Sequence, residues 1–484
     1  MLKLDDRSLL RETCLLAGEW RSAADGATLA VNNPATLDII AHVPRLAQAE
    51  VEQAVASAQQ AFEQWRQKTA GQRCALLRRW FELITENSED LAAIMTAEQG
   101  KPLTESRGEV SYAASFIDWF AEEGKRTYGD VIPPTQADKR LLVIKQPVGI
   151  CAAITPWNFP AAMITRKAGP ALAAGCVMIV KPAKQTPLTA LALGELAMRA
   201  GIPAGVLQVI TGDSKVIGGV LTRSDVVRKL SFTGSTAIGR TLMADCAPTL
   251  KRLSLELGGN APFIVFDDAN LEEAVEGALQ SKYRNAGQTC VCTNRFLVQS
   301  GIYDRFAQRL AEKVAELKIG NGADEGVQIG PLIDEDAVVK VQQHLKDAQQ
   351  KGGKVTTGGV RLTPEGLFIT PAVIVNADRE MLVAREETFG PVAPLFRFDT
   401  EQQAIEMAND TEFGLAAYFY TENSRRMWRV SEALEYGMVG HNTGLISNEV
   451  APFGGIKQSG MGREGSKYGI DEYLEIKYLC TTVG

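Results

Sequence analysis

Hydrophobic residues recur at three- and four-residue intervals along the first quarter of the chain. In the segment AEVEQAVASAQQAFEQW (residues 49–65) this spacing places the apolar side chains on one face of an α-helix. The segment LAAIMTAEQGKP (91–102) ends with Gly100 followed closely by Pro102, which is typical of a helix terminus. The pattern predicts helices through most of residues 47–126.

A different pattern begins near residue 141. The stretch LLVIKQPVGICAAIT (141–155) is rich in β-branched and apolar residues and predicts two strands around a turn. Short apolar runs then alternate with segments of helical length, and this alternation predicts a parallel, doubly wound sheet. The expected strands are 176–182, 206–212, 228–234, 251–259 and 261–269, and the expected helices are 187–201 and 235–247.

A second α/β region is expected after Gly287 and continues to about residue 445. Two stretches fit neither compact unit, namely roughly 127–148 and the C-terminal tail 472–484. The tail, EYLEIKYLCTTVG, alternates apolar and polar residues, which predicts an edge strand.

The composition restricts the class of protein. The chain has 484 residues with 45% hydrophobic and 23% charged content, which is ordinary for a globular protein of two or three domains. Its formal net charge of −7 argues against a nucleic-acid binder, which needs a concentrated basic surface. The N-terminal segment does not resemble a signal peptide, and no run reaches the roughly eighteen apolar residues of a membrane span, so no membrane association is expected.

The eight cysteines are scattered along the chain, which suits a reducing compartment and predicts a cytoplasmic protein. The chain has only three histidines, and no group of cysteines and histidines has the spacing of a metal site. We therefore expect no bound metal.

Residues 285–294, NAGQTCVCTN, place Cys290 in a small polar setting with Cys292 two residues further on. A catalytic thiol needs a base or an electropositive environment, and no histidine lies in a motif with Cys290, so the expected base is a carboxylate. The segment LELGGN (255–260) presents Glu256 at the end of a strand-like run. Taken alone, a cysteine is more often a small buried hydrophobic residue, and a strand-end glutamate more often forms a salt bridge.

Together, at this spacing and with these flanks, the two segments resemble the aldehyde dehydrogenase superfamily. In that family the first carries the catalytic cysteine and the second the general base. The resemblance extends over nearly the whole chain, and among the branches of the family it is strongest to the succinate-semialdehyde dehydrogenases. The further segments that carry it are ITPWNFP at 154–160, KPAK at 181–184, FTGSTAIG at 232–239, EETFGP at 386–391 and PFGGIKQSG at 452–460.

The resemblance implies an α/β fold with a doubly wound Rossmann-type cofactor domain, an α/β catalytic domain and a small bridging β arm for oligomerisation. Because an uncovered edge strand would invite uncontrolled pairing, we expect a homo-oligomer, either a dimer or a tetramer. The expected boundaries are 1–126 and 149–257 for the cofactor domain, 258–445 for the catalytic domain, 446–471 for a segment returning toward the cofactor domain, and 127–148 and 472–484 for the arm.

A cofactor is expected at the carboxyl edge of the first sheet, where open α/β folds bind ligands. FTGSTAIG follows a strand and opens a helix, so its backbone N–H groups can face a phosphate, although a plain helix N-cap explains such a segment about equally often. The resemblance assigns Lys181 and Glu387 to the ribose hydroxyls. It assigns Gly234 and Ser235 to the pyrophosphate region and Phe389 to the nicotinamide side. The other expected cofactor contacts are Trp157, Pro182, Ala183, Lys184, Gly239 and Leu257.

Lys184 bears on the choice of cofactor. Members of the family that use NAD commonly have a glutamate there, which would repel a 2′-phosphate, whereas a lysine ammonium attracts it. One such contact contributes on the order of 1–3 kcal/mol, enough for about a tenfold preference or more. We predict NADP, with NAD as the weaker alternative; a solvated surface lysine is the other interpretation.

The resemblance also implies the reaction. The Cys290 thiolate attacks the aldehyde carbon, and the Asn158 side-chain amide and the Cys290 backbone N–H stabilise the oxyanion. Hydride leaves to the nicotinamide, and Glu256 activates the water that hydrolyses the thioester. Glu256 argues against an enzyme that passes the acyl group to coenzyme A. The presence of both nucleophile and base argues against a catalytically inactive structural relative.

Two arginines bear on the substrate. Arg166 follows Asn158 by eight residues, and Arg284 precedes Cys290 by six, each on an expected helix. Arginine is a bidentate partner for a carboxylate, and semialdehyde dehydrogenases of the succinate type have arginines at these places with a serine matching Ser447. We predict succinate semialdehyde, with glutarate semialdehyde close behind because one methylene is worth only ~1–3 kcal/mol. Either arginine could instead pair with a protein carboxylate. A broad-range aldehyde or betaine-aldehyde dehydrogenase is the remaining alternative, and it has no use for Arg166 and Arg284.

Cys292 has three interpretations: packing, a spare thiol, or a redox partner of Cys290. Some semialdehyde dehydrogenases with a C-V-C sequence are reported to form this disulfide as a switch. A disulfide between residues two apart is strained and therefore easily reduced. We retain the redox switch as a hypothesis.

Overall fold

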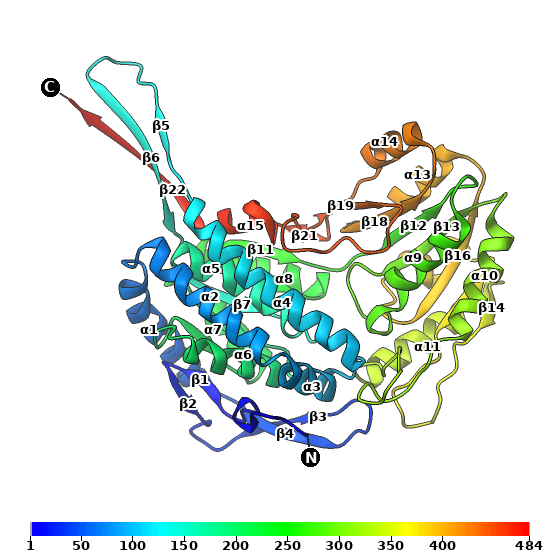
Figure 1. Ribbon diagram of the computed structural model, residues 1–484, viewed down its shortest axis with the longest axis horizontal. Coiled ribbons are helices and arrows are strands. Elements are labelled where there is room, and N and C mark those ends of the chain that lie inside the picture. Colours follow the sequence, from blue (N-terminus) through cyan, green and yellow to red (C-terminus); the bar gives the residue numbers. More distant parts are fainter. Residues whose placement is uncertain (1, 484) are drawn as a thin grey trace.

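The structure, a computed structural model, describes residues 2–483. The chain forms two α/β bodies that lie side by side, and a β arm projects from the edge of the first (Figure 1). Each body has its own hydrophobic core: the first contains buried side chains from Leu9 to Leu257 and from Ile470 to Leu474, and the second contains those from Ala261 to Phe453. The expected α/β class is confirmed.

The first body is built on an eight-stranded sheet. In sheet order its strands are β2 (Glu19–Arg21), β1 (Cys14–Leu16), β9 (Leu207–Val209), β8 (Val177–Lys181), β7 (Ile150–Ile154), β10 (Val227–Thr233), β11 (Arg252–Glu256) and β21 (Gly460–Met461). The strands from β9 to β11 are parallel, and their order reverses at β7, because β8 and β9 follow on one side of it and β10 and β11 on the other. Such a reversal opens a crevice at the carboxyl ends of the flanking strands.

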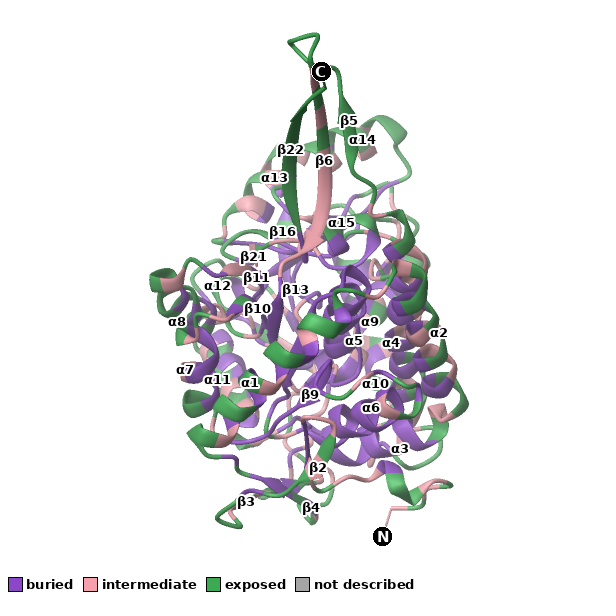
Figure 2. Ribbon diagram, turned by 90° about the vertical axis from the view of Figure 1, so that its left-hand side faces the viewer, coloured by how far each residue is buried: buried purple, intermediate pink, exposed green. Residues whose placement is uncertain are grey.

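Helices cover both faces of this sheet, and the buried strands lie between them (Figure 2). Two local signals fix helix ends near the crevice. The helix that starts at Thr236 is capped by Ser235, whose hydroxyl accepts from the Ile238 N–H at 3.4 Å, and the helix that stops at Gln99 is followed by Gly100 at φ 92°. The helices are α1 (Gln48–Trp65), α2 (Ala70–Glu86), α3 (Ser88–Gln99), α4 (Leu103–Glu123), α5 (Ala162–Ala174), α6 (Leu188–Arg199), α7 (Ser214–Arg223), α8 (Thr236–Cys246) and α15 (Ser466–Asp471).

The second body is built on a seven-stranded sheet, parallel except at one edge. In sheet order its strands are β14 (Lys354–Thr357), β15 (Ala372–Val375), β16 (Val392–Phe398), β13 (Thr293–Gln299), β12 (Ala261–Val265), β18 (Ala416–Tyr420) and β19 (Met438–His441). Its helices are α9 (Leu271–Tyr283), α10 (Tyr303–Ala315), α11 (Glu335–Gln350), α12 (Leu382–Arg385), α13 (Glu401–Asn409) and α14 (Ser424–Ala433).

The arm is a three-stranded antiparallel sheet that extends away from both bodies (Figure 1). Its strands are β22 (Leu474–Thr482), β6 (Lys139–Pro147) and β5 (Asp130–Ile132), in that order. The tail therefore forms the expected edge strand and pairs with β6 over its whole length. Two further strand pairs join β3 (Thr28–Asn32) to β4 (Ile39–Pro44) and β17 (Phe413–Gly414) to β20 (Ile456–Lys457).

The structure corrects the sequence-based elements at three places. The apolar run 261–269, which the alternation assigns to the first series, forms β12 in the second sheet, because a buried parallel strand looks the same in either sheet. The pattern does not predict α7, whose paired glycines Gly218 and Gly219 weaken the helical signal; Asp213 caps it by accepting from Lys215 and Val216. Arg284 lies at the C-cap of α9, where the chain leaves the helix.

Candidate active site

A cavity of about 490 Å³ lies at the carboxyl ends of β7, β10 and β11, where the first body faces the second. This is the position at which a reversal of strand order opens a crevice. It brings together residues from five of the segments recognised in the sequence. The cavity is lined by Pro156, Trp157, Asn158, Thr233, Gly234, Ser235, Glu256, Leu257, Gly258, Cys290, Asp336, Ala337, Lys340, Glu387, Thr388 and Phe389.

The Cys290 loop holds a strained backbone. Asn285 and Ala286 have φ values of 52° and 54°, in the left-handed region that non-glycine residues avoid. Asn285 is held there by three contacts: its N–H donates to Glu105 at 2.8 Å, its side-chain amide donates to the Asn158 carbonyl at 3.0 Å, and Gln99 donates to it at 3.0 Å. The turn between α3 and α4 therefore fixes the loop that carries the thiol.

Gly287 shows why this loop and the EETFGP segment meet. It has φ 76°, and a Cβ at this position would lie 2.2 Å from the Gly390 carbonyl oxygen. The two backbones therefore approach more closely than any side chain permits. This contact brings Glu387 and Phe389 beside Cys290.

Asn158 is anchored through its backbone. Its carbonyl accepts from the Lys101 ammonium at 2.7 Å, and Lys101 is itself buried and paired with Glu109 at 2.5 Å. The side-chain amide of Asn158 donates to the Gln288 carbonyl at 3.0 Å, whereas its oxygen has no hydrogen-bond partner within residues 2–483. Since the amide nitrogen carries two hydrogens, one remains for a group in the cavity.

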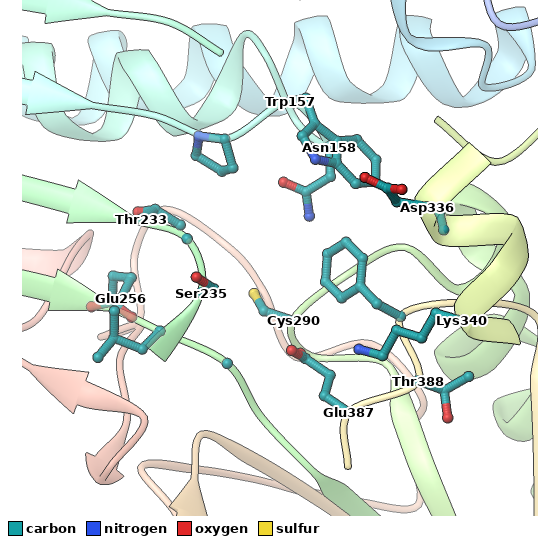
Figure 3. Close-up of a pocket in the computed structure, with 16 residues that line it drawn as sticks. Trp157, Asn158, Thr233, Ser235, Glu256, Cys290, Asp336, Lys340, Glu387 and Thr388 are labelled. Atoms are coloured by element: carbon teal, nitrogen blue, oxygen red, sulfur yellow. The ribbon is translucent and has the colours of Figure 1, made fainter. Parts of the chain in front are cut away.

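The Cys290 side chain is partly exposed to the cavity. Figure 3 shows its sulfur pointing into the cavity, with Asn158 and Ser235 on one side and Glu387 on the other. Burial raises the pKa of the thiol to about 12, although the charge of Arg166 opposes this shift. At neutral pH Cys290 is therefore a neutral thiol that needs a base before it can attack.

Glu256 ends β11 and is buried, 2% exposed, yet neither carboxyl oxygen has a hydrogen-bond partner in the described part of the chain. Burial and the like charge of Glu464 hold its pKa well above the usual range, against the charges of Arg166 and Lys167. A buried, unpartnered carboxyl with a raised pKa is a candidate general base. Gly460 of β21 packs against this strand end, where a Cβ would lie 1.8 Å from the Leu255 carbonyl oxygen.

The two arginines have different partners. Arg166, on α5, is buried, forms an ion pair with Glu464 and lies over the Phe453 ring at 4.1 Å. Arg284 lies 5.4 Å from the Phe159 ring and forms no ion pair with a carboxylate among residues 2–483. The sequence leaves open whether either arginine pairs with a protein carboxylate. In the structure Arg166 does so, and Arg284 does not within residues 2–483.

Several expected residues lie outside the cavity. Lys181 donates to the Ser214 hydroxyl at 2.8 Å, and burial lowers the pKa of its ammonium to about 8. Lys184 is exposed, and Ser447 is half-buried in the loop after β19. Cys292 is buried, and its thiol donates to the Lys282 carbonyl at 3.5 Å, toward the end of α9. The others outside the lining are Arg166, Arg284, Pro182, Ala183 and Gly239, the last of which packs on Leu257.

The comparisons with known proteins agree with this geometry. The model of the aldehyde dehydrogenase family matches residues 20–479. A glutarate-semialdehyde dehydrogenase of Pseudomonas putida is 64% identical over 482 residues, and a succinate-semialdehyde dehydrogenase [NADP(+)] of Escherichia coli is 62% identical over 479, with at least 99% of each chain covered. A crystal structure of an aldehyde dehydrogenase from Brucella melitensis biovar abortus superposes with a TM-score of 0.99 at 65% identity, over the whole of both chains.

The chain belongs to the aldehyde dehydrogenase family. The expected family and enzyme class are therefore confirmed, whereas the names of the relatives differ in the aldehyde they specify.

Several residues of this aldehyde dehydrogenase site lie outside the motifs that the sequence displays. Asp336 and Lys340 reach the cavity from α11, and their four-residue spacing is the one signal that places them on the same helix face. Glu464 follows the PFGGIKQSG segment, and nothing in its flanks indicates that it pairs with both Arg166 and Lys167.

The buried His344 supports the cavity wall of this aldehyde dehydrogenase from behind. One ring nitrogen lies 3.1 Å from the Thr388 hydroxyl and the other 3.3 Å from a Glu386 carboxyl oxygen. Burial lowers the pKa of His344, which favours the neutral ring. Glu387 lies between Glu386 and Thr388 in the sequence and faces the cavity, and burial raises the pKa of its carboxyl to about 7.

The residues that the structure describes contain no group of three or more His, Cys, Asp or Glu side chains able to hold a metal ion. Among the same residues, no helix of this aldehyde dehydrogenase is long and apolar enough to cross a membrane.

Proposed function

We propose that this enzyme oxidises succinate semialdehyde to succinate with NADP as the acceptor. The supporting observation is Arg284, a cation without an ion-pair partner in the described chain, located six residues before the nucleophile. Such a charge favours an aldehyde with an anionic group at its far end. The names of two relatives, a succinate- and a glutarate-semialdehyde dehydrogenase, both specify such aldehydes. Glutarate semialdehyde is the second candidate, favoured by the relative that is 64% identical.

The reaction begins when Cys290 loses its proton. Because burial raises the pKa of the thiol to about 12, the proton has to pass to a base, and the ionised form of Glu256 is the candidate. The sulfur then forms a bond to the aldehyde carbon while the carbonyl electron pair moves to oxygen. The Asn158 side-chain amide and the Cys290 backbone N–H donate to that oxyanion.

The cavity fits a nicotinamide dinucleotide. The α8 N-terminus with Gly234 and Ser235 suits a pyrophosphate, and Trp157 and Phe389, 5.6 Å apart, form an aromatic wall. Glu387 and Lys181 would hold the ribose hydroxyls, and Lys184 a 2′-phosphate. When bound, this cofactor accepts the hydride that the substrate carbon loses.

Hydrolysis completes the reaction. Loss of hydride leaves a thioester on Cys290. Glu256 releases to solvent the proton that it took from Cys290, and its carboxylate then takes a proton from the water that attacks the thioester. The new C–O bond forms as the C–S bond breaks, and the carboxylic acid leaves. The raised pKa of Glu256 suits a base that works near neutral pH.

We further propose a homo-oligomer in the cytoplasm. The arm exposes Val131 at 81% and Ile476 at 73%, and a second copy that covers this apolar surface would remove the open edge of β22. All eight cysteines are free, which fits a reducing compartment.

The redox role of Cys292 stays a proposal. Peroxide would take two electrons and two protons from the thiols of Cys290 and Cys292 and leave a disulfide and water. Inactivation by peroxide that dithiothreitol reverses and that disappears in Cys292→Ala supports this switch. Unchanged sensitivity of that variant refutes it.

The test of the function is a set of initial rates of reduced-cofactor formation under reducing conditions. Succinate semialdehyde, glutarate semialdehyde and butanal are each assayed with NADP and with NAD. We expect kcat/KM for succinate semialdehyde to exceed that for butanal by at least about a hundredfold, the discrimination available from a charged hydrogen-bonded pair. A comparable kcat/KM for butanal would refute a site that binds the distal carboxylate. A higher kcat/KM for glutarate semialdehyde than for succinate semialdehyde would select the second candidate.

A further inference from the structure

Two of the buried polar atoms that lack a hydrogen-bond partner within residues 2–483 lie on neighbouring helices of the first body. They are the hydroxyl oxygen of Tyr112 on α4 and the Nη2 atom of Arg166 on α5. Buried polar atoms are nearly always partnered, and an unmade hydrogen bond is costly. The phenol oxygen can accept from the Arg166 guanidinium, a hydrogen bond that lowers the pKa of Tyr112, so the hydrogen that remains without an acceptor is that of the Tyr112 O–H.

The packing of α4 on α5 places these two atoms close together. Glu109 accepts from the Ala161 and Ala162 N–H groups at the start of α5, at 2.9 and 3.3 Å. Further along the same pair of helices, a Cβ at Gly169 would lie 3.3 Å from the Phe116 carbonyl oxygen. The Glu109–Ala162 and Phe116–Gly169 contacts each join residues 53 positions apart, and the same register places Arg166 opposite residue 113, beside Tyr112.

The charge around these atoms favours an anion. Arg166, Lys167 and Arg284 carry three positive charges, and Glu464 balances one of them. The Glu105 carboxyl faces Arg284, but burial raises the pKa of Glu105 and so reduces its share of negative charge. The pKa of Glu256 is raised well above its usual range, so this carboxyl is less ionised and balances less of the positive charge. Both arginines act on the Tyr112 phenol and lower its pKa, against the larger effect of burial, which raises it. The phenol is therefore a neutral donor at working pH.

Aromatic rings surround this polar group. Phe453 lies under the Arg166 guanidinium at 4.1 Å, Phe159 lies 5.4 Å from Arg284, and Phe116 contacts the Tyr112 ring edge-on at 4.9 Å. In such surroundings a hydrogen bond to an anion is stronger than it is in water.

We propose that Tyr112 is a specificity-determining residue whose hydroxyl donates to the distal carboxylate of the aldehyde, beside Arg284 and Arg166. This inference rests on the proposed function and adds a donor that no recognised sequence segment contains. A hydrogen bond to a charged acceptor corresponds to about a 10- to 100-fold effect. The hydroxyl gives no benefit to an aldehyde that lacks the anion.

The test compares Tyr112→Phe with Tyr468→Phe, a matched change at a tyrosine that is 51% exposed. The values of kcat/KM for succinate semialdehyde and butanal are measured at saturating NADP. We expect Tyr112→Phe to lose about 10- to 100-fold with the semialdehyde, mainly through a higher KM, and to keep its rate with butanal. Tyr468→Phe should change neither value. An equal loss with both aldehydes, or no loss with the semialdehyde, overturns the proposal.

A second readout does not depend on turnover of the semialdehyde. Succinate is added as a dead-end anion while butanal is the substrate, and its inhibition constant is determined. We expect the constant to rise by about tenfold or more in Tyr112→Phe, and an unchanged constant overturns the proposal. If wild-type enzyme shows no preference for the semialdehyde over butanal, the proposed function fails; if wild type shows it and Tyr112→Phe keeps it in full, only the role of Tyr112 fails.

Discussion

The two sides of Cys290 are built in different ways. On the cofactor side lies an open cavity whose wall consists largely of strand ends and helix starts, with glycines at Gly234 and Gly258. On the other side lies a group of polar side chains, in which Arg166 is buried and paired, Arg284 is without an ion pair in the described chain, and Tyr112 has a buried hydroxyl without a geometric hydrogen-bond partner. Backbone turns at strand ends determine the shape of the first side, whereas charged side chains determine what the second side can bind.

This difference separates general from specific binding. Strand ends and a helix start at a reversal of strand order suit any dinucleotide. Their backbone groups contact phosphates and ribose and make no contact that depends on which aldehyde is bound. A buried group of side-chain donors recognises a particular charge at a particular place. Variants on one side should therefore leave the selectivity of the other side unchanged.

The largest effect is expected at the residue that the two sides share. Cys290→Ala removes the nucleophile, and kcat should fall by about 10⁴-fold or more with every aldehyde. The affinity for NADPH, followed by the fluorescence of the bound nucleotide, should stay within about twofold because the cavity wall is intact. Substantial turnover by this variant would contradict the covalent mechanism, and lost NADPH binding would contradict the separation of the two sides.

The two arginines offer a matched pair of variants on the charged side. Arg284→Met should lower kcat/KM for succinate semialdehyde by about 10- to 100-fold, leave butanal unaffected, and change the melting temperature little. Arg166→Met breaks a buried ion pair, which costs about 3 kcal/mol or more and lowers the melting temperature by several degrees. Kinetics with both aldehydes and circular-dichroism melting distinguish the two. Equal losses of stability would show that Arg284 also has a structural partner.

The pKa of Cys290 predicts how its reactivity depends on pH. With a pKa of about 12, the thiolate fraction grows tenfold per pH unit, so alkylation by iodoacetamide without cofactor should accelerate about a hundredfold from pH 7 to pH 9. The rate is measured by mass spectrometry in a Cys480→Ser background, because Cys480 is exposed. Cys290→Ala in the same background gives the residual rate. A plateau below pH 9 would mean that the thiol ionises far more readily.

The smallest effect is expected on the open side. Lys184→Glu should raise the KM for NADP by about tenfold, leave the KM for NAD equal or lower, and preserve the ratio of semialdehyde to butanal activity. Lys354→Glu, at an exposed lysine on the far edge of the second sheet, is the matched control for net charge. An unchanged NADP/NAD ratio would leave Lys184 as a solvated surface residue.

The two sides also differ in what the sequence could predict. The cofactor side follows from contiguous segments, because a strand that ends in LELGGN or FTGSTAIG determines where its backbone lies. The charged side is assembled from α4, α5, the end of α9 and the segment after β21, which no local pattern connects. The sequence could therefore name Arg166 and Arg284 but not the ion pair with Glu464, and it could not single out Tyr112. In the fold, β12 was assigned to the wrong sheet for the same reason: strand partners are not a local property.

The clamped segment 284–290 has a consequence for chain length. Arg284 and Cys290 lie six residues apart, and the bonds that Asn285 makes with Gln99 and Glu105 hold the segment between them in its left-handed turn. For an aldehyde held at both ends, the separation of Arg284 and Cys290 sets the chain length that fits. This separation cannot change without breaking those hydrogen bonds. If Arg284 holds the distal carboxylate, as proposed, an aldehyde with one more methylene would have to bend to fit the same spacing.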